Sequence, residues 1–169
     1  MAGRRLSRRG LCLGIGALAC LPGPARPADD PVDLEWTDLL PTGETSLPPE
    51  LQGLVQHDQA PLMSQQRAST GVRTDWNGRT VRLPGFVVPL DYDGTGMTAF
   101  LLVPYVGACI HVPPPPANQL VLVTTERPYE SDHLFEPVTV TGMFGTATTS
   151  TQLADVGYAL SADGIEPYR

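Results

Sequence analysis

The chain of 169 residues contains no lysine, only three cysteines and three histidines, and no apolar run long enough to anchor it stably in a membrane. A spanning helix needs about 20 mainly apolar residues, and the apolar stretch Leu11–Leu21 is shorter than that. The charge is unbalanced, with 11 basic and 18 acidic residues. Because such a surface repels phosphate backbones, we expect no nucleic-acid partner.

The common catalytic motifs are also missing. The sequence has no C-x-x-C, H-E-x-x-H or G-x-S-x-G pattern and no phosphate-binding glycine loop. One thiol-enzyme interpretation remains, in which Cys109 is the nucleophile and His111 its base. Catalytic partners are usually far apart in sequence, which disfavours this pair. We therefore expect no enzyme and assign no catalytic residue.

The N-terminus has the pattern of a removable export signal. Four arginines precede the apolar stretch, no acidic residue occurs before Asp29, and small residues and prolines follow. The pair Arg8-Arg9 is compatible with either a Sec or a twin-arginine signal. Cleavage is expected between residues 19 and 28. Cys20 also loosely fits a lipoprotein box, although Ala17 stands where a larger aliphatic residue is usual, which makes lipid anchoring the weaker alternative.

Export would leave a strongly acidic domain in the periplasm. If cleavage falls near Ala28, six arginines remain against 18 acidic residues, a net charge of −12. Cys109 is then the single cysteine of the mature chain and cannot form an internal disulfide bond. Its thiol must be buried, bound to metal, reactive, or paired with another molecule.

The mature chain divides into two parts. Residues 29–75 are expected to form an extended arm that docks through Trp36, Leu39 and Leu40, a short N-terminal helix that starts at Ser46, and a loop. Residues 76–169 are expected to form a β-barrel-like domain. The 17 glycines and 18 prolines of the chain favour turns over long helices.

Alternating apolar residues and turn clusters predict five strands in the second part. Pro84-Gly85 is expected to interrupt the first strand with a bulge or bend. With a long insertion before the third strand, the pattern suits a mainly β fold, a small OB-like five-stranded barrel. The predicted strands are Arg79–Leu90, Met97–Val103, Gln119–Thr125, Pro137–Phe144 and Asp155–Ser161.

The candidate site is a Cys-x-His pair before four consecutive prolines. In an extended chain Cys109 and His111 point to the same side, where one ion could bind both. A thiolate and an imidazole suit zinc, with Cu(I) as second choice. A structural zinc site almost always has four ligands. His133 is a candidate third ligand, and a homodimer could supply others.

The residues alone leave the role of this segment open. Cysteine often packs as a small buried apolar side chain, and His111 could hold the loop through a hydrogen bond. The prolines must run as a stiff polyproline II segment, which could instead present a docking surface. Asn118 and Gln119 are expected to satisfy loop backbone first. The candidate partner-binding residues are Tyr105, Pro113, Pro114, Pro115, Pro116, Asn118 and Gln119.

Three blocks carry a family resemblance. Leu83–Leu90, Phe100–Tyr105 and Gly107–Gln119, which contains Cys-Ile-His-Val-Pro-Pro-Pro-Pro, resemble the bacterial domain-of-unknown-function family 3299 over about residues 76–168. The resemblance implies an exported protein, often encoded beside ABC-type transporter genes, some of them linked to zinc limitation. It implies no catalytic mechanism.

These observations give two expectations. The first is a periplasmic metal-binding or metal-linked accessory protein that serves an ABC-type transport or envelope system and binds zinc. The alternative is a metal-free interaction module that docks on a transporter or other envelope partner through the proline-rich loop.

Overall fold

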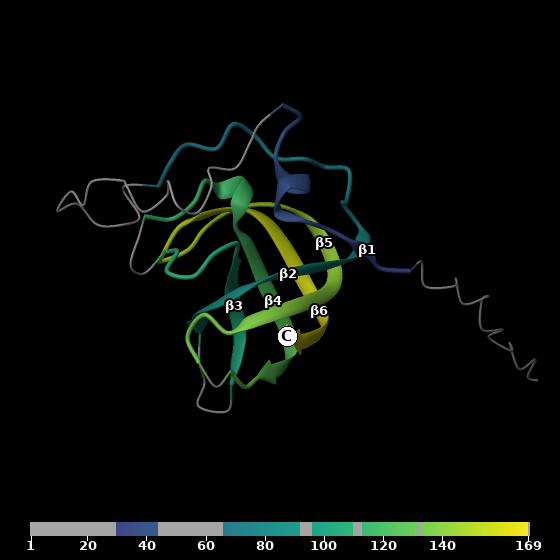
Figure 1. Cartoon of the computed structure of the whole chain (residues 1–169), viewed down its shortest axis with the longest axis vertical. Coiled ribbons are helices and arrows are strands. Elements are labelled where there is room, and N and C mark those ends of the chain that lie inside the picture. The colour runs from purple at the N-terminus through teal and green to yellow at the C-terminus, as the bar shows by residue number, and fades with distance from the viewer. Residues whose placement is uncertain (1–29, 44–65, 92–95, 110–112, 132, 169) are drawn as a thin grey trace, which may run out of the picture.

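The computed structural model describes residues 30–43, 66–91, 96–109, 113–131 and 133–168, and within them the fold is mainly β (Figure 1). Six strands form one mixed sheet, accompanied by the 3-10 turns η1 (Trp36–Leu39) and η3 (Ala117–Gln119). The predicted export signal and the predicted helix at Ser46 lie outside the described residues. The strands are β1 (Val32–Asp33), β2 (Arg79–Asp91), β3 (Met97–Val103), β4 (Val121–Tyr129), β5 (Pro137–Ser150) and β6 (Asp155–Pro167).

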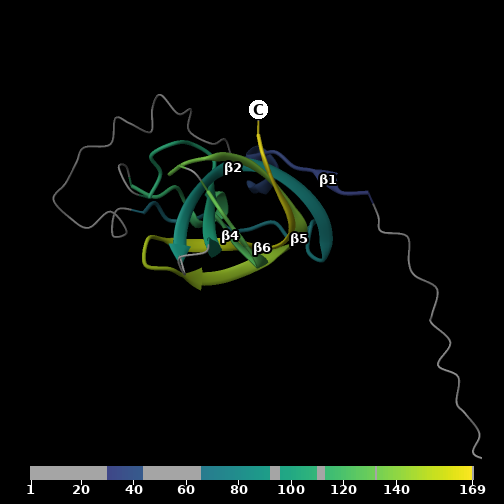
Figure 2. The ribbon, with the colours of Figure 1, turned by 90° about the horizontal axis from the view of Figure 1, so that it is seen from below.

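The strand pairings form a closed circuit. β2 pairs antiparallel with both β3 and β5, and β3 pairs antiparallel with β4. β4 pairs in parallel with β6, which returns antiparallel to β5. The short β1 adds a parallel pairing on β2. In Figure 2, β2 arches over the other strands, which lets it reach β3 with one end and β5 with the other.

The predicted strands are all present, but their bounds differ. β3 has the predicted bounds. β4 begins at Val121 instead of Gln119, which belongs to η3, and it continues beyond Thr125 to Tyr129. β5 and β6 also continue by several residues, beyond Phe144 and Ser161. The extension of β5 pairs with the first part of β6, and the extension of β6 pairs with the first part of β5. Many of their side chains are exposed, so they show no apolar alternation. Apolar periodicity reports burial and therefore missed the exposed ends of paired strands.

The bulge expected at Pro84-Gly85 is wrong. β2 runs through these residues without a break, and the register shift between β2 and β3 falls instead between Pro89 and Asp91. Gly85 is needed for close packing: a Cβ there would lie 2.8 Å from Cγ of Leu102 and 3.0 Å from the Trp36 ring. The glycine thus allows β2 to pass tightly between β3 and the N-terminal arm.

Two apolar clusters fill the fold. The first joins Leu34 and Leu39 of the arm to inward-facing residues of β2 through β6, including the stacked rings of Phe144 and Tyr158. The second, called here the second cluster, lies under the segment that follows β3. It contains Val88, Leu101, Val103, Ala108, Cys109, Leu120, Phe135, Ala154 and Val156.

The arm docks as the sequence predicts. Leu39 and Leu40 are buried, and Nε1 of Trp36 donates a 2.8 Å hydrogen bond to the carbonyl of Pro84. In the described part of the chain, no helix is long and apolar enough to cross a membrane.

Candidate functional site

The Cys109 segment leaves β3 at Val103 and turns inward. Cys109 is only 3% exposed and has a left-handed backbone conformation, with φ of 68°. Its thiol packs in the second cluster, beside side chains such as Ala108 and Phe135. His111 lies outside the described residues. The cysteine that the sequence singled out is thus a buried member of an apolar cluster.

Burial governs the chemistry of this thiol. It raises the pKa of Cys109 to about 12, because the apolar surroundings disfavour the thiolate. Burial also raises the pKa of the half-buried Tyr105 to about 12, and the nearby Cys109 contributes in the same direction. Both groups are therefore neutral near pH 7. A neutral, buried thiol is a poor nucleophile.

The described residues do not assemble a complete metal site. His133 is exposed, and its backbone carbonyl accepts hydrogen bonds from the Ser131 hydroxyl and the Glu136 amide. Throughout the described ranges, no three residues of the types His, Cys, Asp or Glu are grouped so that they could hold one ion. Neither Cys109 nor His133 thus belongs to a group of three potential metal ligands among the described residues.

The proline run lies against the body of the domain. Pro114 and Pro115 are buried, and Nε2 of Gln66 bridges the carbonyls of Pro115 and Asp155 with hydrogen bonds of 2.9 and 2.8 Å. Beyond the run, the chain packs closely on β6: a Cβ at Gly157 would lie 2.7 Å from the carbonyl oxygen of Ala117. The prolines therefore stiffen a segment whose middle is packed inward.

Asn118 and Gln119 are buried as well. Nε2 of Gln119 donates to the carbonyls of Trp36 at 2.9 Å and Asn118 at 3.0 Å, which links η3 to the arm. Oδ1 of Asn118 is buried without a hydrogen-bond partner among the described residues. Of the predicted partner-binding residues, Tyr105, Pro113 and Pro116 remain partly exposed.

Comparison with known proteins identifies the family. The family model described as "Protein of unknown function (DUF3299)" matches residues 36–167. The chain belongs to the DUF3299 family. It is similar to the crystal structure of a DUF3299 family protein from Pseudomonas aeruginosa PAO1, with 37% identity and a TM-score of 0.71, over 83% of this chain and 98% of that one. No curated protein matches the chain. The resemblance predicted from the sequence is confirmed.

Two strained residues of this DUF3299 domain meet in the second cluster. Cys109 and Phe135, with φ of 68° and 59°, are the non-glycine residues of positive φ in the described ranges. Each such conformation costs on the order of 1–2 kcal/mol and persists only where the surroundings enforce it. Their burial in one cluster fixes two loops together. Residue type alone did not reveal this pairing, because neither Cys nor Phe favours a left-handed backbone.

The same two loops expose apolar side chains. Val106, next to Tyr105, is 61% exposed, and Leu134, next to Phe135, is 50% exposed. Tyr105 and Phe135 both pack in the second cluster. Each of the two exposed residues is therefore the chain neighbour of a residue that packs in this cluster. We call this set of exposed or partly exposed residues, Tyr105, Val106, Pro113 and Leu134, the loop face.

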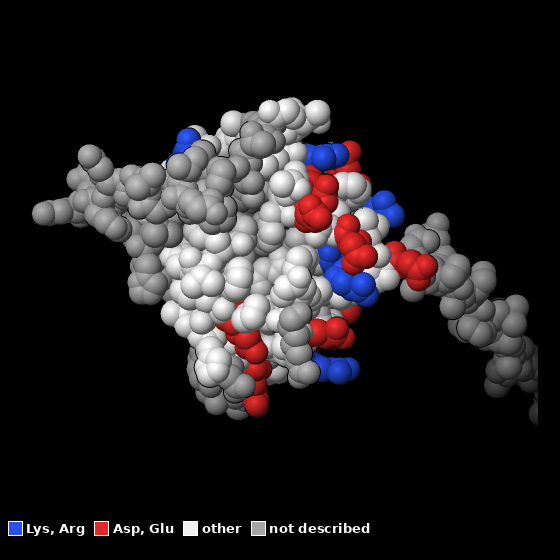
Figure 3. Space-filling view, in the orientation of Figure 1, with Lys and Arg blue, Asp and Glu red and all other residues white. Residues whose placement is uncertain are grey.

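The DUF3299 chain carries no charged residue near Val106 in sequence. Residues 94–125 and 137–154 contain no Asp, Glu, Arg or Lys. This pattern can be read from the sequence and indicates uncharged surface. In Figure 3, red and blue side chains gather toward the side of β1 and the lower end of the molecule. The described surface over the opposite side, where the segment after β3 lies in Figure 1, is mostly white, with a blue side chain at its upper edge.

Proposed function

We propose that this DUF3299 protein is an exported accessory protein of the bacterial periplasm that docks on a subunit of an ABC-type transport system through the loop face. The carrying observation is the exposure of Val106 and Leu134 beside a shared buried cluster, with Val106 inside the uncharged stretch of residues 94–125 in an acidic chain. Exposed apolar patches mark interaction sites, and the cores of protein interfaces are poor in charge.

The proposed scaffold is an OB-like five-stranded barrel made of β2 to β6. Its support is the circuit of pairings from β2 through β3, β4, β6 and β5 back to β2, with one parallel pair, β4 and β6. Closure removes open sheet edges, so that the connecting loops become the natural places for partner contact. The loop face is built from two such connections.

The introduction of a negative charge in the loop face tests the docking proposal. Val106→Asp and Leu134→Asp place a charge where the partner would remove water, which costs several kcal/mol when the charge is unpaired. Each is expected to lower the recovery of the chain with the ABC-type permease at least tenfold. The matched control is Met143→Asp on β5, another exposed apolar residue, at 58% exposure. Equal recovery of all three variants would reject the loop face.

Zinc binding is the second candidate, with Cu(I) behind it. It is favoured by the strained conformation of Cys109 two residues before His111, since strain often collects at ligand clamps. Coordination would deprotonate the thiol despite its raised pKa. His133 or a second copy of the chain would complete the ligand set.

Metal analysis separates the two candidates. The mature protein is purified without a metal-binding tag, and its zinc and copper are measured by mass spectrometry alongside Cys109→Ser and His111→Ala. About one metal per chain or per dimer, lost in both variants, supports the zinc candidate. Folded protein that neither contains nor takes up zinc or Cu(I) rejects it and leaves docking alone.

Export is tested by the N-terminus of the protein from cells. Mass spectrometry of the periplasmic fraction is expected to find a start between residues 20 and 29. A lipid on Cys20 would identify the lipoprotein alternative, and a chain that keeps Met1 in the cytoplasm would contradict export.

A further inference from the structure

A second surface opens where β4 and β6 separate. Their parallel pairing ends at Thr125 and Ala162. Past this point β4 bulges, since it passes from Thr124 to Tyr129 while β3 passes only from Ala99 to Met97. β6 has its own shift at Asp163, which falls between the pairs Gly142–Ala162 and Thr141–Gly164. Bulges bend strands and often lie beside binding sites.

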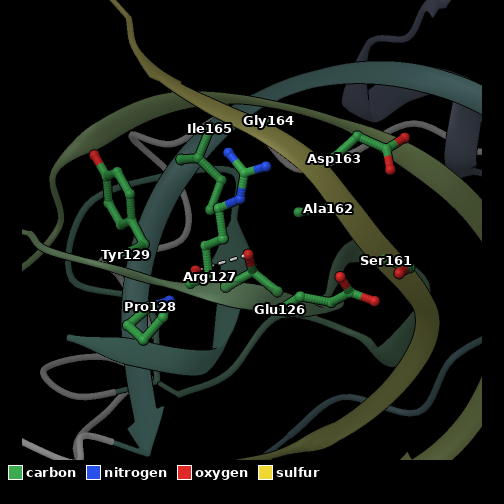
Figure 4. Close-up of a pocket in the computed structure, with 10 residues that line it drawn as sticks. Glu126, Arg127, Pro128, Tyr129, Ser161, Ala162, Asp163, Gly164 and Ile165 are labelled. Carbon is green, nitrogen blue, oxygen red and sulfur yellow. Dashed lines mark hydrogen bonds between the residues drawn. The ribbon is translucent and has the colours of Figure 1, made fainter. Parts of the chain in front are cut away.

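The two bulges border an open cleft of about 400 Å³ (Figure 4). Such a volume lies within the range of small-ligand sites. The β4 bulge is held by a 2.9 Å hydrogen bond from the Thr125 hydroxyl to the carbonyl of Arg127. The cleft is lined by Thr125, Glu126, Arg127, Pro128, Tyr129, Ser161, Ala162, Asp163, Gly164 and Ile165.

Arg127 is the cation of this cleft. Figure 4 shows its side chain reaching from β4 toward β6, with Tyr129 and Ile165 on one side and Asp163 on the other. Arg73 and Arg82 form ion pairs with Asp75 at 2.8 Å and Asp33 at 3.2 Å. Among the described residues Arg127 forms no ion pair, although it stands in an acidic chain. Its guanidinium is therefore available to a carboxylate, which it can bind through two parallel hydrogen bonds.

The other walls restrict what can accompany that carboxylate. Tyr129 and Ile165 are half-buried and offer apolar contact. Glu126 and Asp163 are exposed carboxylates, which repel a second anion and favour an amine. From Asp163 to Ile165, β6 pairs only with β5 among the described strands. The other backbone edge of β6 therefore faces the cleft. Such an edge suits an extended peptide.

We propose that the cleft between β4 and β6 binds a short peptide through its free C-terminal carboxylate. Arg127 binds the carboxylate, the edge of β6 binds the peptide backbone, and Tyr129 and Ile165 contact a small side chain. Asp163 or Glu126 attracts the N-terminal amine. A phosphate or dicarboxylate ligand fits less well, because the cleft has one cation and two carboxylates.

The test uses tri-alanine as the probe and the mature protein labelled with ¹⁵N. Titration into the millimolar range is expected to shift the amide signals of Thr125–Arg127, Tyr129 and Ser161–Ile165. Tri-alanine amide lacks the carboxylate and is expected to bind at least tenfold more weakly. Arg127→Met keeps the apolar stem but removes the charge, and it should weaken tri-alanine binding at least tenfold. The control Arg79→Met, an exposed arginine on β2, should bind within twofold of the wild type.

Several results would overturn the proposal. These are the absence of shifts in the cleft, equal binding of the acid and the amide, and equal binding by Arg127→Met. Equal binding of acetate would also overturn it, because the site would then recognise an anion and not a peptide. The loop-face variant Val106→Asp should leave tri-alanine binding unchanged, so this proposal and the docking proposal fail or survive separately.

Discussion

The hydroxyl of Tyr158 donates a 2.8 Å hydrogen bond to the backbone carbonyl of Leu39, which joins strand β6 to the N-terminal arm. The same hydroxyl accepts a 2.7 Å hydrogen bond from the amide of Arg73. One buried side chain on β6 thus fixes two segments that precede the first long strand. The arm is consequently part of the folded domain and not a tail beside it.

Tyr158→Phe should therefore destabilise the fold. It leaves the Leu39 carbonyl and the Arg73 amide without their partner, at a cost of about 1–3 kcal/mol in the free energy of unfolding. Urea unfolding followed by circular dichroism measures this. Tyr168→Phe is the matched control, because Tyr168 is 60% exposed and surface changes usually stay within about 0.5 kcal/mol. An equal effect of both changes would contradict the role assigned to Tyr158.

Tyr158 should also contribute to alkaline unfolding. Burial raises the pKa of its hydroxyl above the ordinary value of 10.0. Above pH 10 the unfolded chain loses this proton before the folded chain does, so stability that is complete below pH 10 falls as the pH rises through the folded pKa. Urea midpoints between pH 8 and 11 should fall less steeply for Tyr158→Phe than for the wild type. Parallel curves would show that this hydroxyl is not linked to folding.

The ribbon of β5 and β6 provides a matched pair of glycines. A Cβ at Gly142 would overlap the carbonyl oxygen of Ser161 and lie 2.8 Å from Cα of Ala162, both backbone atoms. Gly142→Ala should cost about 3 kcal/mol or more, because strands would have to shift. A Cβ at Gly164 would meet nothing within 4 Å, so that Gly164→Ala should be nearly neutral. Thermal unfolding of both variants checks this, and a stable Gly142→Ala protein would contradict the packing described.

Substitutions of Cys109 distinguish a packed thiol from a ligand. Cys109→Ser buries a hydroxyl in an apolar cluster and should cost about 1–3 kcal/mol, more than Cys109→Ala. If the thiol served only as a metal ligand, the two variants would lose the same metal–sulfur bond and should be destabilised equally. Urea unfolding in the presence of a chelator gives the order. The wild-type thiol should also react with Ellman's reagent slowly at pH 8 and rapidly after unfolding.

The sequence was informative wherever apolar side chains are buried. Met97–Val103, whose last four residues are all buried, was predicted with its correct bounds, and the docking of Leu39 and Leu40 followed from apolar residues in an otherwise polar arm. The outer halves of β5 and β6 were missed because backbone pairing, and not burial, forms them. Pro84-Gly85 indicated a break, but Gly85 instead permits close contact with Leu102.

The candidate site was located but not resolved by the sequence. The segment around Cys109 was recognisable from residue order, and its family is confirmed. Its conformation depends on the second cluster, where Phe135 arrives from a loop distant in sequence. No local pattern encodes that meeting. The β4–β6 cleft was unpredictable for the same reason, since it results from two bulges on different strands.

The most direct test of the central claim places a photo-reactive amino acid at Val106 in the full-length protein in its own cells. Illumination is expected to join the chain to one ABC-type transporter subunit, and Leu134→Asp in the same chain should remove that product. The same reactive residue at Met143 should not yield it. If Val106 gives no transporter product, or if Met143 gives the same one, then the loop face is not the docking surface.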